Sequence, residues 1–388
     1  MRKRMKLGAI LLSALTLFSM ASCGKKDSNA TFEPIVALAQ TNGDVVYQPT
    51  IAGNPSEKVE IPLLTGDIYE ICKNYKLYIT KDYNKDKKDV YAPTGLTISW
   101  TCDETPKYYT LELATKEDMS DAASYVTFDN EVQLDYLFMG YDYYYQICAN
   151  YENKIVKSRV FEFSTAHLPR TVYVDEQVTN TRDFGGYYTD EGKRVKQGIA
   201  YRGGKMDQIT EEGKRIMLQE LRIKTDLDIR GDGEYTQNVS PLGDSVQFVS
   251  LAAPWYAYGG GQGIDGSTYR AGLLQEIRMF TKKENYPIYV HCSIGRDRTG
   301  TICFLINGLL GVSETDLDLD YELTFMSRNR GDKDVREFIG TSYLYIKSYL
   351  KSTYKQFSTY KERIEAFMLD IGITESEIAA IRANMLEA

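Results

Sequence analysis

The chain has 388 residues, enough for two domains, and its 43% hydrophobic and 26% charged residues are ordinary for a soluble globular protein. Its formal net charge of -8 argues against a nucleic-acid partner, because nucleic-acid backbones are bound by basic surfaces. Its two histidines and six cysteines show no spacing suited to zinc, so we expect neither a metal site nor another cofactor.

The first residues of the chain are typical of an export signal. A basic segment, residues 2–6, precedes an apolar stretch, residues 7–20, that is too short for a comfortable transmembrane span. The stretch ends in Met-Ala-Ser-Cys, which resembles a bacterial lipobox. We predict a lipoprotein signal peptide over residues 1–22 and a lipidated Cys23 at the mature N-terminus. An ordinary signal peptide with an incidental Cys23, or an uncleaved anchor, is the alternative.

This prediction places the protein outside the cytoplasm, on the periplasmic side of the bacterial cell envelope or at the cell surface. Residues 23–31 would be a tether, and the protein would meet the membrane only through its lipid. An oxidising compartment would permit one disulfide among Cys72, Cys102 and Cys148, and the sequence leaves the pairing open.

Residues 32–166 are predicted to form a β-sandwich, with the clearest strand patterns over residues 90–165. Alternation in the first clear strand places four side chains on one face: Leu96, Ile98, Trp100 and Cys102. The strands resemble a fibronectin type III-like module, a likeness that says little about function. We expect the tyrosines at 143–149 to be strand formers that pack half-buried on one face. The less favoured alternative is that they form a platform on which carbohydrate stacks.

Helical and strand patterns alternate over residues 170–388, which predicts an α/β domain with a central, mainly parallel sheet. We expect strands at 224–229, 246–251 and 288–290, and helices at 210–221, 269–280, 360–371 and 375–386. Ligands bind such sheets beyond the carboxyl ends of the strands, which is where Cys292 falls. Cys303 lies in an apolar helical run and should be buried.

The strand at 288–290 runs into a polar loop that opens a helix near Thr299. The first turn of a helix leaves backbone N–H groups unpaired, so this loop can bind an anion. Cys292 begins the loop and Arg298 ends it. The guanidinium of Arg298 supplies positive potential, which a thiolate needs at neutral pH, and its planar fork can bind two phosphoryl oxygens.

The string His-Cys-x-x-Gly-x-x-Arg-Thr-Gly at residues 291–300 resembles the phosphate-binding loop of cysteine-dependent protein tyrosine phosphatases. Over residues 170–388, the chain is similar to the bacterial tyrosine phosphatase family that includes a secreted mycobacterial protein and lipid phosphatase. The stretches that carry this likeness are 182–187, 201–204, 225–230, 310–313 and 320–324. The chain departs from the family where Phe184 replaces the usual Leu and Gly203 the usual Ser.

The resemblance implies that Cys292 attacks phosphorus and forms a phosphocysteine intermediate, which water then hydrolyses. Loop amides and the Arg298 guanidinium would stabilise the phosphoryl oxygens in the transition state. Thr299 would donate a hydrogen bond to the sulfur, and His291 would orient the loop rather than move a proton. The implied phosphate-binding residues are Ser293, Ile294, Gly295, Arg296, Asp297, Arg298 and Thr299.

Three aspartates are candidates for the acid that protonates the leaving group. Asp297 lies inside the loop, as in the family, and is the first choice; Asp228 matches the family's Asp-Leu-Arg aspartate and is the second. Asp265 is the third, because a mobile Gly-rich loop could bring it over the substrate. Each could instead be a solvated or structural carboxylate. Residues 255–258 form either an aromatic lid or a plain surface loop.

These features predict a cysteine-dependent phosphatase that acts on phosphotyrosine, in a protein or a small phosphomonoester. The nearest alternative is a phosphoinositide or inositol-phosphate phosphatase, because Arg296 and Arg298 both suit polyanionic head groups. An alternative of another class is a non-catalytic surface protein that binds phosphate or mediates adhesion. The intact Cys292 argues against it, since a binding site does not need a nucleophile.

Overall fold

In a computed structural model of the chain, the described residues are 34–38, 60–61, 95–102, 104–231, 234, 238–252, 263–327 and 343–388. They form two compact units that divide between His167 and Leu168. The predicted signal peptide, Cys23, the tether, Cys72 and the aromatic stretch 255–258 lie outside the described residues. None of the helices that the structure describes is long and apolar enough to cross a membrane.

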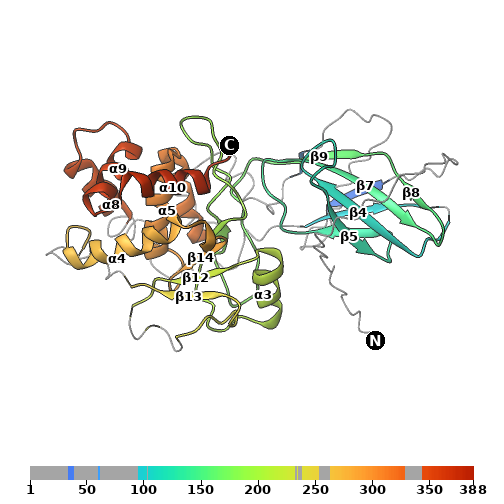
Figure 1. The fold of residues 1–388 in the computed structure, drawn as a ribbon, viewed down its shortest axis with the longest axis horizontal. Coiled ribbons are helices and arrows are strands. Elements are labelled where there is room, and N and C mark those ends of the chain that lie inside the picture. Colours follow the sequence, from blue (N-terminus) through green and yellow to red (C-terminus); the bar gives the residue numbers. More distant parts are fainter. Residues whose placement is uncertain are drawn as a thin grey trace. The chain divides into compact units, whose positions relative to one another are not determined.

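The described part of the first unit contains two β-sheets (Figure 1). One has the strand order β1-β3-β6, and the other has the order β2-β9-β7-β4-β5, with β8 paired to β7. The strands are β1 Pro34–Leu38, β2 Glu60–Ile61, β3 Leu96–Trp100, β4 Tyr108–Ala114, β5 Ala123–Thr127, β6 Glu131–Leu134, β7 Asp142–Asn150, β8 Ile155–Lys157 and β9 Phe161–Thr165.

The alternation predicted for β3 is confirmed, because Leu96, Ile98 and Trp100 are buried and the residues between them are half-buried. On β7, Tyr143 and Tyr145 are also buried. Their rings stack on aromatic rings of β9 with centroid distances of 5.2 and 5.3 Å. These tyrosines therefore fill the interior of the unit rather than forming a platform. The likeness to a fibronectin type III module stays a prediction.

The cysteines of the first unit that the structure describes are free thiols, namely Cys102 and Cys148. Cys148 is buried within β7, and Cys102 is half-buried just beyond β3. Neither takes part in the disulfide that the sequence left open.

The second unit is built on a five-stranded sheet with the order β10-β11-β14-β12-β13. The strands β11, β14, β12 and β13 run parallel to their neighbours, whereas β10 is antiparallel to β11. This confirms the predicted mainly parallel sheet, and the fully buried β14 is typical of a strand covered on both faces. The strands are β10 Arg182–Asp183, β11 Ala200–Gly203, β12 Thr225–Asp228, β13 Gln247–Ser250 and β14 Ile288–His291.

Helix α5 is the central helix of the second unit. It is buried around nearly its whole circumference, as its apolar sequence predicts, and it contacts β11 and β14 as well as α9. It begins at Asp297, slightly before the predicted start, and ends at Leu310, where the next residue, Gly311, caps it with a left-handed backbone (φ 94°). Cys303, within α5, is buried as predicted.

The helices predicted at 210–221, 269–280, 360–371 and 375–386 are confirmed to within two residues at each end. Figure 1 shows α4, α5, α8, α9 and α10 gathered in one group, with α3 apart from them. The helical segments are α3 Glu211–Arg215, which continues as the π-helix η1 Ile216–Glu220, α4 Ser267–Arg278, η2 Met279–Thr281, η3 Lys283–Asn285, α5 Asp297–Leu310, α6 Glu314–Glu322, η4 Leu323–Met326, α8 Tyr343–Thr353, α9 Tyr360–Asp370 and α10 Glu375–Met385.

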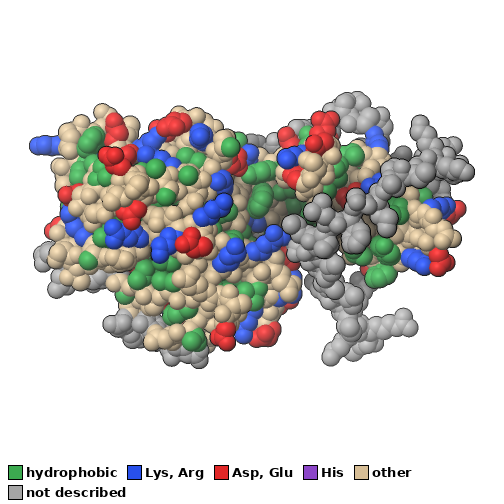
Figure 2. Space-filling model, viewed as in Figure 1, with side chains coloured by type: hydrophobic (Ala, Val, Ile, Leu, Met, Phe, Trp, Pro, Cys, Tyr) green, Lys and Arg blue, Asp and Glu red, His purple; other side chains and the backbone are tan. Residues whose placement is uncertain are grey.

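The surface carries charges of both signs. On the face drawn in Figure 2, Lys and Arg side chains lie among Asp and Glu side chains.

Candidate active site

Three parallel strands end together at one edge of the sheet in the second unit. Gly203 and Asp228, the last residues of β11 and β12, both lie opposite His291, the last residue of β14. Cys292 follows directly, and α5 begins at Asp297. The predicted nucleophile therefore leaves the sheet at its carboxyl edge, where α/β sheets bind ligands.

Three consecutive carbonyl groups of the loop after Cys292 face other elements of the protein. They belong to Ser293, which accepts from the Lys205 amide at 3.3 Å, Ile294, which accepts from Asn180 Nδ2 at 2.8 Å, and Gly295, which accepts from Arg202 Nη2 at 2.6 Å. In a planar trans peptide the N–H points opposite to the C=O, so the N–H groups that follow these carbonyls face the inside of the loop. Within the described residues, the amides of Ile294 and Gly295 donate no hydrogen bond, so they are available to an anion.

Gly295 allows the loop to lie directly against β11. Its φ of +69° favours glycine, and a Cβ atom there would lie 2.2 Å from the carbonyl oxygen of Gly203. Gly203 is also constrained, because a Cβ atom would lie 2.1 Å from the Tyr289 hydroxyl. That hydroxyl donates to Gly204 O at 2.7 Å. The glycine that stands in place of the family's serine therefore makes room for the Tyr289 side chain.

The environment of Cys292 favours its thiolate. Its side chain is buried, with 3% of the residue exposed, and burial alone would raise its pKa. The positive charge of Arg298 and hydrogen bonds from Thr299 outweigh burial and lower the pKa of Cys292, although the charge of Asp297 opposes them. The Thr299 hydroxyl is buried and has no other hydrogen-bond partner among the described residues, so it is available to donate to the sulfur of Cys292.

The guanidinium of Arg298 holds a carboxylate across its two terminal nitrogens. Nη1 donates to Glu234 Oε1 at 2.6 Å, and Nη2 donates to Glu234 Oε2 at 2.8 Å. The Ser293 hydroxyl donates to the same Oε2 at 2.9 Å. These hydrogen bonds, first of all those from Arg298, lower the pKa of Glu234 to about 2. The planar fork of Arg298 is therefore arranged to bind two oxygens of one anionic group.

His291 is buried beneath the loop and hydrogen-bonded to a carboxylate of β12. Its Nε2 lies 2.9 Å from Asp226 Oδ1, and its Nδ1 lies 3.4 Å from Cys292 O and 4.0 Å from Asp228 Oδ1. Burial would lower the pKa of His291, but the charge of Asp226 and its hydrogen bond raise it overall. The imidazole contacts the backbone of the nucleophile rather than its sulfur, which fits an orienting role.

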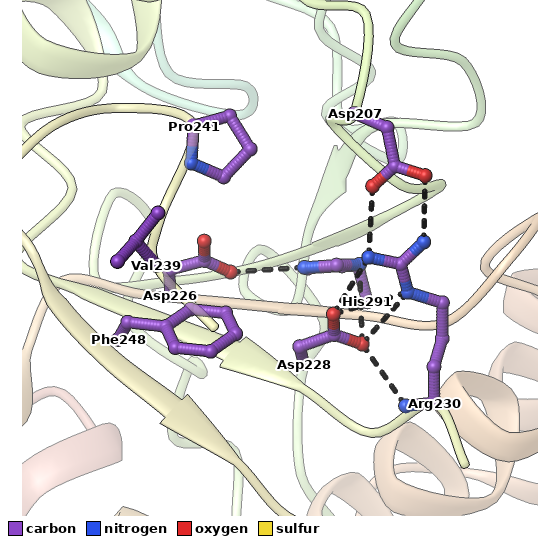
Figure 3. A pocket seen from close by; sticks show the side chains of 8 residues that line it. All are labelled: Asp207, Asp226, Asp228, Arg230, Val239, Pro241, Phe248 and His291. Atoms are coloured by element: carbon purple, nitrogen blue, oxygen red, sulfur yellow. Dashed lines mark hydrogen bonds and ion pairs between the residues drawn. The ribbon is translucent and has the colours of Figure 1, made fainter. Parts of the chain in front are cut away.

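Asp228 is committed to Arg230, as Figure 3 shows. Arg230 Nη2 donates to Asp228 Oδ2 at 2.7 Å, and the other side of the guanidinium binds both oxygens of Asp207 at 2.8 Å. The side chains of Asp228 and Arg230 are both buried. The second candidate acid is therefore half of an ion pair that fixes the end of β12.

The side chains in Figure 3 also line a small cavity of about 70 Å³. Its lining combines these charged groups with Val239, Pro241 and Phe248. This volume is far below the roughly 300–1,000 Å³ of pockets that enclose small-molecule ligands. We therefore do not assign the substrate to it.

Asp297, the first candidate acid, lies at the start of α5 and is buried. Its Oδ1 accepts from the Tyr321 hydroxyl at 2.9 Å, and its Oδ2 accepts from Arg296 Nε at 3.0 Å. The Arg296 side chain is buried as well. Arg296 therefore contacts the loop's own carboxylate, and Asp297 is close enough to Cys292 for its charge to act on the thiol.

The third candidate acid, Asp265, lies exposed just before α4. In the part of the chain that the structure describes, no group of three or more His, Cys, Asp or Glu side chains could hold a metal ion. The geometry therefore brings together Cys292, Arg298, Thr299 and Asp297, with His291 and Asp228 behind them.

A model described as the tyrosine phosphatase family matches residues 174–387. The chain belongs to this family. A protein of Cupriavidus necator whose name assigns it to the tyrosine-protein phosphatases is 25% identical over 175 residues, which cover 38% of this chain and 60% of that protein.

The chain is also similar to two solved structures. The core catalytic domain of the PP-IP phosphatase Siw14 from S. cerevisiae, in complex with citrate, has 17% identity and a TM-score of 0.28, with 42% of this chain and 94% of that chain covered. A second Siw14 catalytic core has 15% identity and a TM-score of 0.27, with 39% and 92% covered.

Sequence reasoning missed two residues of this tyrosine phosphatase family site, Glu234 and Asn180. Glu234 follows the Asp-Ile-Arg stretch at 228–230 but meets Arg298, 64 residues away in sequence. Asn180 immediately precedes the 182–187 stretch and contacts Ile294, 114 residues away. Their closeness to recognised stretches was the available signal, but their partners follow only from the fold.

We expect Cys292 to be alkylated by iodoacetamide at neutral pH much faster than Cys148 or Cys303. Burial raises the pKa of Cys148 to about 11 and that of Cys303 to about 12, whereas the pKa of Cys292 is lowered. Because the thiolate is the reactive form, the order of alkylation follows these pKa values. Peptide mapping by mass spectrometry over a pH series gives the rate for each cysteine.

Thr299→Val is the matched variant for this experiment, since it keeps the shape of the side chain and removes the hydroxyl. The midpoint of Cys292 alkylation should move to higher pH, with no change for Cys303. An unchanged midpoint would show that the hydroxyl does not stabilise the thiolate.

Proposed function

We propose that the protein hydrolyses phosphomonoesters, phosphotyrosine first among them, through a phosphocysteine intermediate. The observation that carries this proposal is the loop at 292–298, where a buried cysteine with a lowered pKa begins a ring of inward-facing amides closed by Arg298. Membership of the tyrosine phosphatase family supports it. The chain spans about 60% of the length of the curated relative, so the activity is argued from the site.

The reaction proceeds in two displacements at phosphorus. The Cys292 thiolate attacks, the bond from phosphorus to the ester oxygen breaks, and the leaving oxygen takes a proton from a carboxylic acid. Water then attacks the phosphocysteine and gives a proton to that carboxylate, and the S–P bond breaks to release phosphate and the thiolate. Loop amides and Arg298 stabilise the equatorial oxygens in both transition states.

Phosphotyrosine is the substrate class that the loop favours over inositol polyphosphates. Arg298 offers one bidentate fork, while Arg296, the other loop arginine, is buried against Asp297. A single phosphoryl group satisfies this arrangement. A polyphosphorylated head group would gain little from Arg296.

Purified protein should hydrolyse a phosphotyrosyl peptide with higher kcat/KM than a phosphoinositide or an inositol phosphate. Cys292→Ser should abolish hydrolysis, and Arg298→Lys should lower kcat by about 10²–10³-fold, comparable with the loss of an oxyanion donor. Phosphate release measured over this substrate panel makes the comparison. Preference for the inositol compounds would reassign the substrate class. Hydrolysis that is equal in Cys292→Ser and wild type would reject Cys292 as the nucleophile, and no hydrolysis by either protein would leave only phosphate binding.

The leaving-group acid should be Asp297 rather than Asp228. Asp297→Asn should remove the basic limb of the pH–kcat profile and lower kcat most for poor leaving groups. Asp228→Asn is the matched control: it weakens the ion pair to Arg230, so it should lower stability and leave the shape of the profile unchanged. Loss of the basic limb in Asp228→Asn alone would transfer the role to Asp228.

We further propose that the protein is exported and anchored to the cell envelope by a lipid on Cys23, on the strength of the basic and apolar residues 1–22 and the lipobox-like residues before Cys23. Cells that express the full chain should incorporate labelled fatty acid into it and carry it in the membrane fraction. Cys23→Ala should lose both. Labelling that survives in Cys23→Ala would reject the anchor.

A further inference from the structure

We propose that Arg202, oriented by Asp320, is a positioning residue for the reaction: it holds the Gly295 peptide so that the loop's amides face the phosphoryl group. This inference rests on the proposed phosphatase function and adds a role that the loop sequence does not show. It concerns stretches 201–204 and 320–324, which lie outside the loop at residues 292–298.

Arg202 connects the loop to a buried carboxylate. It belongs to β11, and none of its surface is exposed. Its Nη2 donates to Gly295 O at 2.6 Å and lies 3.5 Å from Arg296 O, while its Nη1 donates to Asp320 Oδ2. One guanidinium therefore binds a helix carboxylate with one nitrogen and the loop backbone with the other, which a single-point cation such as lysine cannot reproduce.

Asp320 also binds a second arginine, Arg182. Through Asn180, this arginine is connected to the carbonyl of Ile294, the residue before Gly295 in the loop. Arg182 Nε donates to Asp320 Oδ1 at 2.9 Å, and its Nη1 donates to Asn180 Oδ1. Asn180 Nδ2 in turn donates to Ile294 O at 2.8 Å. Asn180 has a φ of +63°, a left-handed backbone that asparagine tolerates better than most residues. We call Arg182, Arg202, Asp320 and Asn180 the loop brace.

The loop brace carries an excess of positive charge beneath the loop, because two guanidinium groups share one aspartate carboxylate. Burial would raise the pKa of Asp320, but the two arginines lower it overall, so the carboxylate stays charged. A hydrogen bond from a cation to a carbonyl is stronger than a neutral one, and it polarises the peptide so that the N–H on its far side binds anions better. The brace thereby favours both the thiolate and a bound phosphoryl group.

Gly300 leaves room for the guanidinium of Arg202 beside α5. A Cβ atom on Gly300, in the first turn of α5, would lie 3.3 Å from Arg202 Nη2 and 3.0 Å from the Tyr321 ring. The glycine of the Arg-Thr-Gly string thus lets the guanidinium pass between α5 and the loop. The string and the stretches at 201–204 and 320–324 meet at this point.

The test is Arg202→Lys, with two readouts that do not require turnover. The first is the pH midpoint of Cys292 alkylation, and the second is the concentration of inorganic phosphate that protects Cys292 from alkylation. Loss of the charged hydrogen bond to Gly295 should move the midpoint to higher pH and weaken phosphate protection about tenfold, within the range for hydrogen bonds to charged groups. In steady-state assays, KM should rise along with a fall in kcat.

Arg170→Lys is the matched control. Arg170 is buried to a similar extent and pairs with Asp183 at 2.8 Å, and its side chain also donates to the Tyr201 hydroxyl. Neither partner belongs to the loop or to the loop brace. Arg170→Lys should lower the melting temperature as Arg202→Lys does and leave the alkylation midpoint and phosphate protection at wild-type values. If Arg202→Lys does not fold, Arg202→Gln replaces it, because the neutral amide removes the charge from the hydrogen bond to Gly295 O.

The positioning role would be overturned if Arg202→Lys, or Arg202→Gln in its place, loses stability but keeps the wild-type midpoint and phosphate protection. The brace would then be structural support only. Wild-type protein that shows no phosphate protection and no low-pH alkylation would instead refute the proposed function. The role of Arg202 would then be refuted as well. The two outcomes are distinguishable, because the first is seen only when the wild-type protein shows phosphate protection and low-pH alkylation.

Discussion

The orientation of the peptide groups between Cys292 and Arg296 is the constraint on which the site depends. The N–H and C=O groups of a peptide point in opposite directions. A buried loop can therefore turn its N–H groups inward only if other groups donate hydrogen bonds to its outward-facing carbonyls. In this protein three consecutive carbonyls are satisfied by groups from residues 180–205. The inward orientation of the amides therefore depends on the segment around β10 and β11 as much as on the loop itself.

A comparison between two cysteines of the same unit shows what the loop achieves. Cys303, on α5, is as buried as Cys292, and burial raises the pKa of Cys303 to about 12. Burial also opposes the thiolate of Cys292, yet the pKa of Cys292 is lowered below that of an ordinary thiol. The charge of Arg298 and the hydrogen bonds from Thr299 therefore outweigh the effect of burial and favour the thiolate of Cys292.

The sequence predicted the features that depend on neighbouring residues. Hydrophobic runs located β14 and α5, and the spacing of Cys292 and Arg298 located the loop, because these elements are contiguous in the chain. It could not predict that Arg296 turns to Asp297, or that Asp228 is held by Arg230 and Asp207, since both depend on how rotamers pack once the strands align. Glu234 and Asn180 were missed for a related reason, as were the roles of Arg182, Arg202 and Asp320 within recognised stretches: their partners lie 64 to 138 residues away.

The ion pair between Arg298 and Glu234 competes with the binding of a phosphoryl group, because Glu234 occupies both terminal nitrogens of the guanidinium. With a pKa of about 2, Glu234 stays charged at every pH at which the enzyme would work, so it keeps the guanidinium extended across the mouth of the loop. A phosphoryl group must share or displace this carboxylate. It carries more negative charge than a carboxylate and also reaches the loop's inward-facing amides, whereas the Glu234 carboxylate accepts hydrogen bonds from Arg298, Ser293 and the amide of Gly231. A phosphoryl group therefore gains hydrogen bonds from the inward-facing amides that Glu234 lacks. The orientation of these amides depends in turn on the hydrogen bonds that the outward-facing carbonyls accept.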